Sequence, residues 1–235
     1  MKLKIAILGL LSLSLLGVAT GAHAQTASVY VVHGIDGRDL GLDQSLPVDV
    51  LANGSICLLQ NFTFGTVAGP VALDPGSYNL QISLANTTSP CANPAVITAD
   101  VIFSAGESAS VIANLDANGA PTANKYTEDL SPVAKGMSRV LVHHDAWAPA
   151  VDIKLRLTNT KKTAMFTNVE NPESADAAVK SGCWRVAIFP AGDKTPVLGP
   201  LPLKLKENHA YLVYAVGSLT NNTLTLITKR IKVNN

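Results

Sequence analysis

Short runs in which every second residue is apolar fill most of this chain after its first two dozen residues. The runs are separated by Gly, Pro, Asn and Asp, which favour turns, and the 3.6-residue period of an amphipathic helix is almost absent. This pattern predicts an all-β protein made of half-buried antiparallel strands. Candidate strands begin at Val29, Val48, Tyr78, Ala109, Arg139, Val151, Arg185 and Tyr211.

The two halves of the chain repeat one another in the order and type of these segments. Matching segments are Val31-Val32-His33 with Leu141-Val142-His143, Pro47-Val48-Asp49 with Ala150-Val151-Asp152, and Gly76-Ser77-Tyr78 with Gly182-Cys183-Trp184. The repetition predicts two tandem immunoglobulin-like β-sandwiches, each with about seven strands, at residues 25–118 and 137–235. Residues 119–136 are expected to form a linker with at most a short edge strand. We interpret a set of recurring residues as structural elements of the repeat: His33, Asp49, Gly76, Tyr78, Gly182 and Trp184.

Residues 1–24 have the character of a secretory signal peptide. Lys2 and Lys4 precede the apolar stretch 5–18, and Ala22-His23-Ala24 has the small-x-small form of a cleavage site. That stretch is shorter than the ~20 residues that span a bilayer, and no later segment is long and apolar enough. We expect a mature chain that begins at Gln25, has no transmembrane segment, and is periplasmic or secreted.

The charge balance excludes two broad classes of protein. The formal net charge is +1, only 15% of the residues are charged and 47% are hydrophobic. A disordered tail needs low hydrophobicity, and a nucleic-acid binder usually has a basic excess. The pair Lys161-Lys162 is interpreted as a solvated hairpin tip. No nucleic-acid partner is expected.

Export changes how the three cysteines are interpreted, because oxidising compartments favour disulfides. Cys57 and Cys91 are the predicted pair, and closing a loop of about 34 residues stabilises a fold by roughly 3–4 kcal/mol. Cys183 is interpreted as a buried core thiol. An intermolecular disulfide and a reactive thiol are the alternatives.

One segment resembles a known family. Residues 143–153, with the sequence HHDAWAPAVDI, are similar to the opening motif of the domain-of-unknown-function family 4397. Asn53-Gly54, residues 64–67 and residues 74–78 fit further segments of the same family pattern. The resemblance covers nearly the whole mature chain as two copies. It implies exported bacterial β-sandwich domains, often in tandem, and brings no catalytic residues or ligand.

The recurring His and Asp residues allow two interpretations. Because they occur in both copies, hydrogen bonds that hold the fold are the favoured role, since one active site would need only one copy. The alternative is a metal site, because imidazole and carboxylate groups suit a divalent transition metal. Adjacent residues of a strand point to opposite faces, however, so the neighbouring His143 and His144 cannot easily reach one ion. The candidate ligands are His143, His144, Asp145, Asp152 and His209.

Signals for catalysis and for sugar binding are weak. No G-x-S-x-G, S-x-x-K, H-E-x-x-H or phosphate-binding loop is present, and no catalytic residue is assigned. The carboxylate pairs Glu128-Asp129 and Glu170/Glu173 are interpreted as solvated. Trp147 is a candidate for stacking on a sugar, with burial of its loop as the favoured alternative.

The sequence therefore predicts an exported, non-catalytic binding, adhesion or envelope-structural protein, whose partner is an unidentified protein or glycan of the cell envelope. No cofactor is expected. The first alternative is a hydrolase or accessory subunit that acts on envelope or extracellular polymer. The second is a metal- or redox-responsive periplasmic protein.

Overall fold

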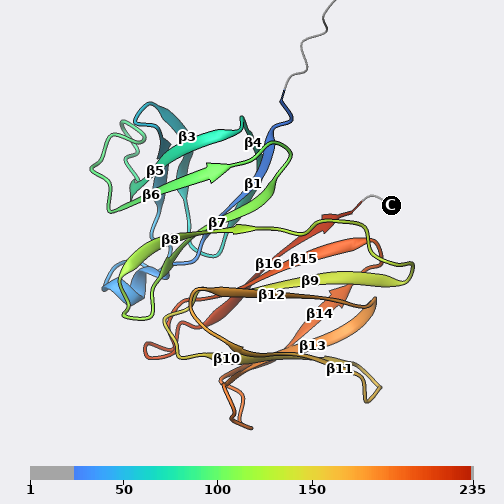
Figure 1. Cartoon of the computed structure of the whole chain (residues 1–235). Coiled ribbons are helices and arrows are strands. Elements are labelled where there is room, and N and C mark those ends of the chain that lie inside the picture. The colour runs from blue at the N-terminus through green and yellow to red at the C-terminus, as the bar shows by residue number, and fades with distance from the viewer. Residues whose placement is uncertain (1–23, 234–235) are drawn as a thin grey trace, which may run out of the picture.

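The computed structural model describes residues 24–233, and its regular secondary structure is almost wholly β-strand (Figure 1). The predicted signal peptide lies outside the described residues, apart from its last residue. Within residues 24–233, the one regular helical turn is the 3-10 helix η1 (Gly37–Leu40), and no helix has the length and apolar character needed to cross a membrane. The predicted all-β class is confirmed.

The first eight strands form two facing four-stranded sheets, which gives a β-sandwich. Their order is β4-β1-β7-β8 in one sheet and β3-β2-β5-β6 in the other. The strands are β1 (Ala27–His33), β2 (Val48–Ala52), β3 (Ile56–Phe62), β4 (Val67–Leu73), β5 (Gly76–Leu84), β6 (Ile97–Phe103), β7 (Ser108–Leu115) and β8 (Pro121–Thr127).

The next eight strands repeat this arrangement in the same order. The second sandwich has the sheets β12-β9-β15-β16 and β11-β10-β13-β14. Its strands are β9 (Met137–His144), β10 (Val151–Leu157), β11 (Thr163–Val169), β12 (Glu173–Lys180), β13 (Gly182–Pro190), β14 (Leu198–Leu205), β15 (His209–Val216) and β16 (Thr225–Lys232).

Two features of the sandwiches differ from the sequence-based expectation. Each sandwich is not purely antiparallel, because β1 pairs in parallel with β7 and β9 pairs in parallel with β15. Each also has eight strands among the described residues rather than about seven. The additional strand β8 lies inside segment 119–136 and forms the edge of its sheet beside β7, and β16 is its counterpart in the second sandwich.

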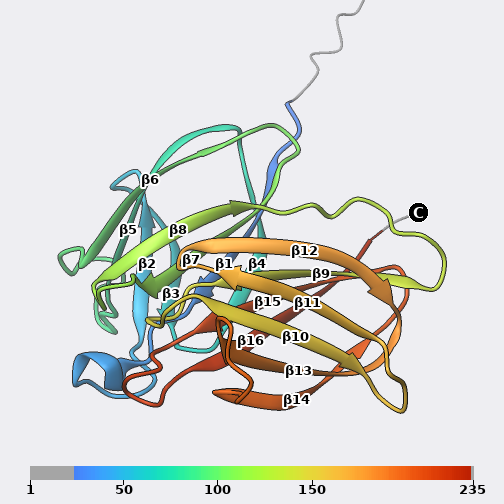
Figure 2. The same cartoon turned by 60° about the horizontal axis from the view of Figure 1, so that its bottom comes forward.

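The four sheets stack, and an apolar core fills each space between them. Two clusters fill the first sandwich, and one cluster that contains Ile153, Trp184 and Val213 fills the second. A further cluster joins the two sandwiches, with Tyr30 and Ile112 from the first and Leu141 and Leu212 from the second. The sheets β4-β1-β7-β8 and β12-β9-β15-β16 therefore lie against each other (Figure 2).

The structure confirms the predicted disulfide and shows equivalent anchors in the two copies. Cys57 and Cys91 are bonded, with their Cα atoms 5.9 Å apart. The Tyr78 hydroxyl donates a hydrogen bond to the carbonyl of Asp74 (2.9 Å), and the Trp184 indole Nε1 donates one to the carbonyl of Lys180 (2.8 Å). Both aromatic rings reach back four residues, so these positions are equivalent in the repeat.

Candidate functional site

The candidate residues at the end of β9 lie where the two sandwiches meet. His143, His144 and Asp145 are all buried, with at most 1% of each residue exposed. Because alternate residues of a strand face opposite sides, His143 points toward the first sandwich and His144 toward the core of its own sandwich. The expected separation of the two imidazoles is therefore observed.

The histidine that matches His33 is His144 rather than His143. His33 Nε2 lies 2.8 Å from the carbonyl oxygen of Leu46, and His144 Nε2 lies 3.0 Å from that of Pro149. The parallel partners agree, since His33 pairs with Ala113 and His144 with Ala215. The sequence match of His33 with His143 is thus wrong by one residue, and a shift of one residue moves a side chain to the other face of a sheet. Burial lowers the pKa of both His33 and His144, although the hydrogen bonds to the loop carbonyls oppose the shift.

The two recurring aspartates hold loops at equivalent places. Asp49 accepts hydrogen bonds from the backbone N–H groups of Asn61, Asn86 and Cys91, at 2.8–3.0 Å. Burial raises the pKa of Asp49, but the three N–H groups together outweigh burial and the pKa is lowered. Asp152 has the same role with fewer donors, which are the N–H groups of Asn168 (2.9 Å) and Gly192 (3.1 Å).

The five candidate metal ligands are not brought together at one point. Asp152 is occupied by its backbone donors, and His209 begins β15 with its Nδ1 2.7 Å from the Glu207 carbonyl oxygen. His143 and His144 face opposite sides of β9. Within residues 24–233, no group of three or more His, Cys, Asp or Glu side chains is placed to hold a metal ion.

A polar cluster that the sequence analysis did not identify surrounds His143, and we call it the junction cluster. It comprises Tyr126 and Glu128, at the end of the first sandwich, with His143, Asp145 and Tyr214 of the second. The Tyr126 hydroxyl donates to Asp145 Oδ1 (2.8 Å), and His143 Nε2 lies 3.2 Å from Glu128 Oε1. The His143 ring stacks on Tyr214, with centroids 4.9 Å apart. The cluster therefore links the two sandwiches through polar as well as apolar contacts.

The electrostatics of the junction cluster are those of a water-poor interior. Burial raises the pKa of Asp145 to about 6, although His143, Tyr126 and Asn124 partly oppose this shift. Burial, with the negative charges of nearby carboxylates, raises the pKa of Tyr126 and of Tyr214 well above 10. Both phenols therefore stay neutral across the physiological pH range, and Tyr126 donates its hydrogen bond to Asp145.

Several buried atoms of the junction cluster have no hydrogen-bond partner among the described residues. They include both carboxylate oxygens of Glu128, both ring nitrogens of His143 and Oδ2 of Asp145. The Glu128–His143 contact is within ion-pair distance, but its geometry is not that of a hydrogen bond.

A small hollow of about 110 Å³ borders this pair. Its lining includes Glu128, His143, Ser174 and Asp176. The Arg139 guanidinium lies 2.8 Å from Asp176 and 2.6 Å from Asp129, so both acids at the rim are already paired. The hollow thus offers a carboxylate, an imidazole and a hydroxyl, but no hydrogen bond joins Ser174 to His143 among the bonds of the described residues.

Two predictions about individual side chains were wrong. Cys183 is exposed and not a core thiol, because it alternates on β13 with the buried Trp184. Glu128 is only 4% exposed and is not solvated, since β8 carries it into the interface between the sandwiches. Asn124, Tyr126 and Glu128 alternate in the sequence, which is a signal for one polar face, but the burial of that face depends on the second sandwich.

Trp147 lies at the junction of the sandwiches and is half buried. It packs against the core cluster that contains Ile35 and Leu115, and its ring covers Gly119 so closely that a Cβ atom there would lie 2.8 Å from the ring. Its backbone N–H donates to the carbonyl of Gly217 (2.8 Å). One face of the ring is therefore in use within the fold.

Comparisons with known proteins place the chain in a family and add little more. Residues 27–154, more than half of the chain, match a family model described as domain of unknown function (DUF4397). This match extends from β1 through the first sandwich into β10. A search of curated proteins finds no match.

Several solved structures resemble the chain distantly. The TIE protein of Bacillus anthracis is 12% identical, covers 83% of this chain and has a TM-score of 0.25. A candidate cell adhesion protein from Bacteroides ovatus is 10% identical, with 90% of this chain and 99% of the other covered and a TM-score of 0.29. A leucine-rich repeat protein from Bacteroides thetaiotaomicron is 10% identical, covers 82% of this chain and has a TM-score of 0.21. This chain spans 33% of the length of the TIE protein and 26% of the length of the leucine-rich repeat protein. At these scores the similarities carry no argument about function.

Proposed function

This chain belongs to the family of domains of unknown function DUF4397, and we propose that it is an exported, non-catalytic binding module of the cell envelope. The observation that carries the proposal is that the recurring imidazoles and carboxylates of this chain hold its loops in place. His33, His144, Asp49 and Asp152 are all buried and hydrogen-bonded to loop backbone. Groups held in this way maintain a rigid scaffold and are not free to transfer protons to a substrate.

The junction cluster supports the same proposal. Beside the apolar core that joins the two sandwiches, its Tyr126 hydroxyl donates to Asp145 across the interface, and its Tyr214 Oη lies 2.7 Å from Ser110 Oγ of the first sandwich. Such an interface favours a single rigid unit with two outer sheet faces. A rigid unit of this kind holds the residues of its outer faces in fixed positions, which suits binding.

Export is supported by the disulfide and by the character of residues 1–24. The Cys57–Cys91 bond is favoured in an oxidising compartment, such as the bacterial periplasm or the space beyond it. A basic start, an apolar stretch and a small-x-small site precede Gln25 in the sequence. Together they favour a mature protein outside the cytoplasm.

Fractionation of bacteria that produce the full chain tests this proposal. We expect the protein in the periplasmic or extracellular fraction. Its mass should be that of the chain that starts at Gln25, and one thiol should react before reduction. We also expect it to sediment with isolated envelope material. A cytoplasmic chain with three reactive thiols, or failure to bind any envelope fraction, would overturn the proposal.

A hydrolase is the second candidate, because Ser174, His143 and Glu128 line one hollow. Ser174 and His143 are direct partners across β12 and β9, which puts both side chains on the same side of the sheet. Turnover of ester or glycan substrates that is lost in Ser174→Ala would favour this function over binding. The same activity in wild type and Ser174→Ala, or no activity in either, would exclude a serine nucleophile at this place.

A further inference from the structure

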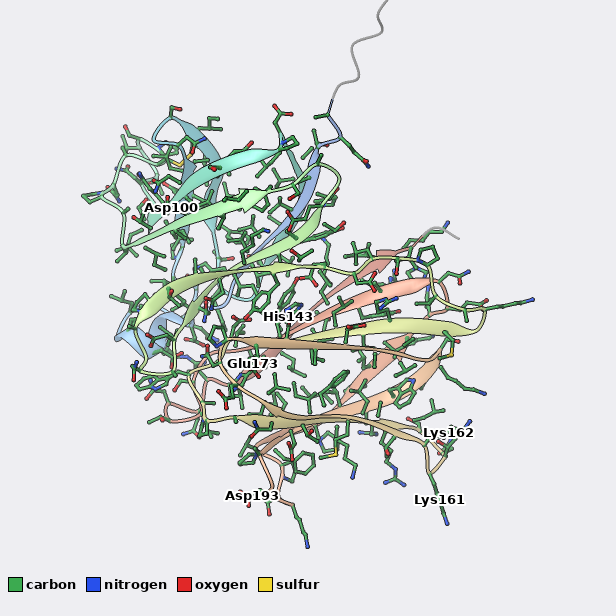
Figure 3. All side chains as sticks on the ribbon, viewed as in Figure 1. Asp100, His143, Lys161, Lys162, Glu173 and Asp193 are labelled. Atoms are coloured by element: carbon green, nitrogen blue, oxygen red, sulfur yellow. A yellow bond between two sulfur atoms is a disulfide. The ribbon has the colours of Figure 1, made fainter. Side chains whose placement is uncertain are left out.

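The charges of this chain are strongly separated between its two sandwiches. Residues 25–128 contain two Lys or Arg and nine Asp or Glu, which gives a net charge of −7. Residues 129–235 contain fourteen and eight, which gives +6. The nearly neutral total therefore conceals an acidic and a basic half. In Figure 3, Asp100 lies on the first sandwich, while Lys161 and Lys162 lie at the far end of the second.

Many of these positive charges gather on the outer face of the sheet β11-β10-β13-β14, and we call the following set the basic face. It comprises Lys154 and Arg156 on β10, Arg185 on β13, Lys204 on β14, and Lys161 and Lys162 in the turn between β10 and β11. All six are exposed. The strand residues alternate with core residues such as Leu155 and Trp184, so they point away from the protein.

The cations of the basic face have no acidic partner. None of the six forms a salt bridge within residues 24–233. The acid on the same face of β10 is Asp152, near the start of the strand. It is buried and accepts hydrogen bonds from the N–H groups of Asn168 and Gly192. In the loop between β13 and β14, Asp193 is offset by the adjacent Lys194.

The unpaired positive charges of the basic face oppose folding, and protection of sheet edges does not explain them. Arg156 and Arg185 are direct cross-strand partners, and like charges in that position destabilise a sheet. Lysines often protect edge strands from aggregation, but β10 and β13 are the two central strands of this sheet. A repulsive pair at the centre of a sheet indicates a use for the charge.

The first sandwich provides an internal comparison. The positions equivalent to Lys154, Arg156 and Arg185 are Leu51, Asn53 and Asn79, because Asp49 corresponds to Asp152 and Tyr78 to Trp184. Asn53 and Asn79 face each other through hydrogen bonds, where the second sandwich has two arginines. The repeated fold therefore does not require cations at these positions.

We propose that the basic face docks on the headgroups of an anionic phospholipid bilayer. This proposal rests on the proposed envelope function and names the surface and the partner. The charges of the face are spread over three strands and a turn, which fits an extended surface of negative charge better than a compact anion. The residues between the cations are Thr163, Met165, Cys183, Ala187 and Pro202, so no aromatic ring lies between them to stack on sugars or bases. The acidic sandwich lies on the opposite side, where a negative surface would not repel it at close range.

Sedimentation with vesicles tests the proposal. The chain from Gln25 onward is mixed at low salt with phosphatidylcholine vesicles that contain about a third phosphatidylglycerol, and with pure phosphatidylcholine vesicles. We expect binding to the anionic vesicles alone, and its loss at about 1 M salt, where the Debye length is about 3 Å. Each Lys or Arg near an anionic surface contributes about 1 kcal/mol, so Lys154→Gln/Arg156→Gln/Arg185→Gln/Lys204→Gln should weaken binding several-hundred-fold.

The control variant removes the same number of exposed charges from elsewhere in the second half of the chain. In Lys135→Gln/Lys180→Gln/Arg230→Gln/Lys232→Gln the basic face is intact, and we expect a less than tenfold change. If the first variant does not fold, as judged by circular dichroism, Lys161→Gln/Lys162→Gln at the exposed turn replaces it, with an expected loss of tenfold or more.

Four results would overturn the proposal. They are no binding to anionic vesicles at low salt, equal losses in the two quadruple variants, binding to a soluble acidic polysaccharide with none to vesicles, and salt-dependent self-association that accounts for all sedimentation. Any of these with an exported protein that sediments with envelope material would leave the proposed function intact. A cytoplasmic chain that binds anionic vesicles would instead refute the envelope function alone.

Discussion

Replacing Asp145 with Asn should change how the stability of the protein depends on pH. The Asp145 carboxyl is fully buried, and burial raises its pKa to about 6 from an unfolded value of 3.8. A carboxyl whose pKa is raised by folding binds its proton more tightly in the folded state, so the folded protein is favoured at low pH. The stabilisation is complete below about pH 3.8 and is lost as the pH rises through about 6.

The magnitude follows from the size of this shift. Roughly two pKa units at 1.36 kcal/mol each give about 3 kcal/mol in total, of which roughly 2–3 kcal/mol is lost between pH 4 and pH 7. In the Asp145→Asn variant, the amide oxygen of the new side chain can still accept the hydrogen bonds from Tyr126 and Asn124, which reach Asp145 Oδ1 at 2.8 and 3.2 Å. Any cost of the buried NH₂ group is the same at every pH, so it cancels from the pH dependence.

Urea unfolding of wild type and Asp145→Asn, followed by tryptophan fluorescence at several pH values, measures this difference. Relative to the wild type, the variant should gain roughly 2–3 kcal/mol of unfolding free energy between pH 4 and pH 7. Asp193→Asn, in an exposed loop, is the control and should show no such trend. A difference between wild type and Asp145→Asn that stays constant with pH would refute the assigned burial of charge in the junction cluster.

Three further predictions concern the repeated anchors and the disulfide. Asp49→Asn should lower the unfolding free energy by about 2–4 kcal/mol, and Asp152→Asn should lower it by about 1–3 kcal/mol. The first loss is larger because three N–H groups donate to Asp49 and two donate to Asp152. Equal urea midpoints for the two variants would contradict this prediction. Burial lowers the pKa of His144, so its contribution to stability is present above about pH 6.5 and falls as the pH drops, and His144→Gln should flatten that fall in urea titrations at pH 5–7. Removing the Cys57–Cys91 bond by a double Ser substitution should lower the unfolding free energy by roughly 3–4 kcal/mol, and an unchanged thermal midpoint would show that the loop is held by other contacts.

The features of this fold that depend on local pattern could be predicted from the sequence. Alternating apolar residues identified most strands, and the Gly-x-aromatic segments that contain Tyr78 and Trp184 revealed the repeat. Both rings make the same hydrogen bond four residues back, which is a local constraint visible in the sequence. The pairing of Cys57 with Cys91 followed from the oxidising compartment and the small number of cysteines.

The features that depend on contacts between distant segments could not be predicted. Parallel pairing of β9 with β15 brings His143 beside Tyr214, and no local pattern encodes that choice. The same pairing sets which of two adjacent histidines is equivalent to His33. Glu128 appeared to be a solvated acid because its burial requires the second sandwich to cover the end of β8.

The basic face also could not be predicted from the net charge of the chain. The net charge of −1 for residues 25–235 hides halves of −7 and +6, and Lys161-Lys162 alone looks like an ordinary turn. Only the strand register places Arg156 beside Arg185, and Lys204 beside Cys183, on one side of the sheet. Charge segregation becomes informative once the sheet that carries it is known.

The central claim is that this protein acts by binding the envelope through the outer face of its second sandwich. Cys183 permits a direct test, because it is an exposed free thiol on that face, beside Lys204. An environment-sensitive fluorophore attached there should shift to shorter wavelength when membranes from the producing cells are added, and high salt should reverse the shift. If the labelled protein sediments with those membranes while the emission stays unchanged, binding occurs through another surface and the claim is wrong.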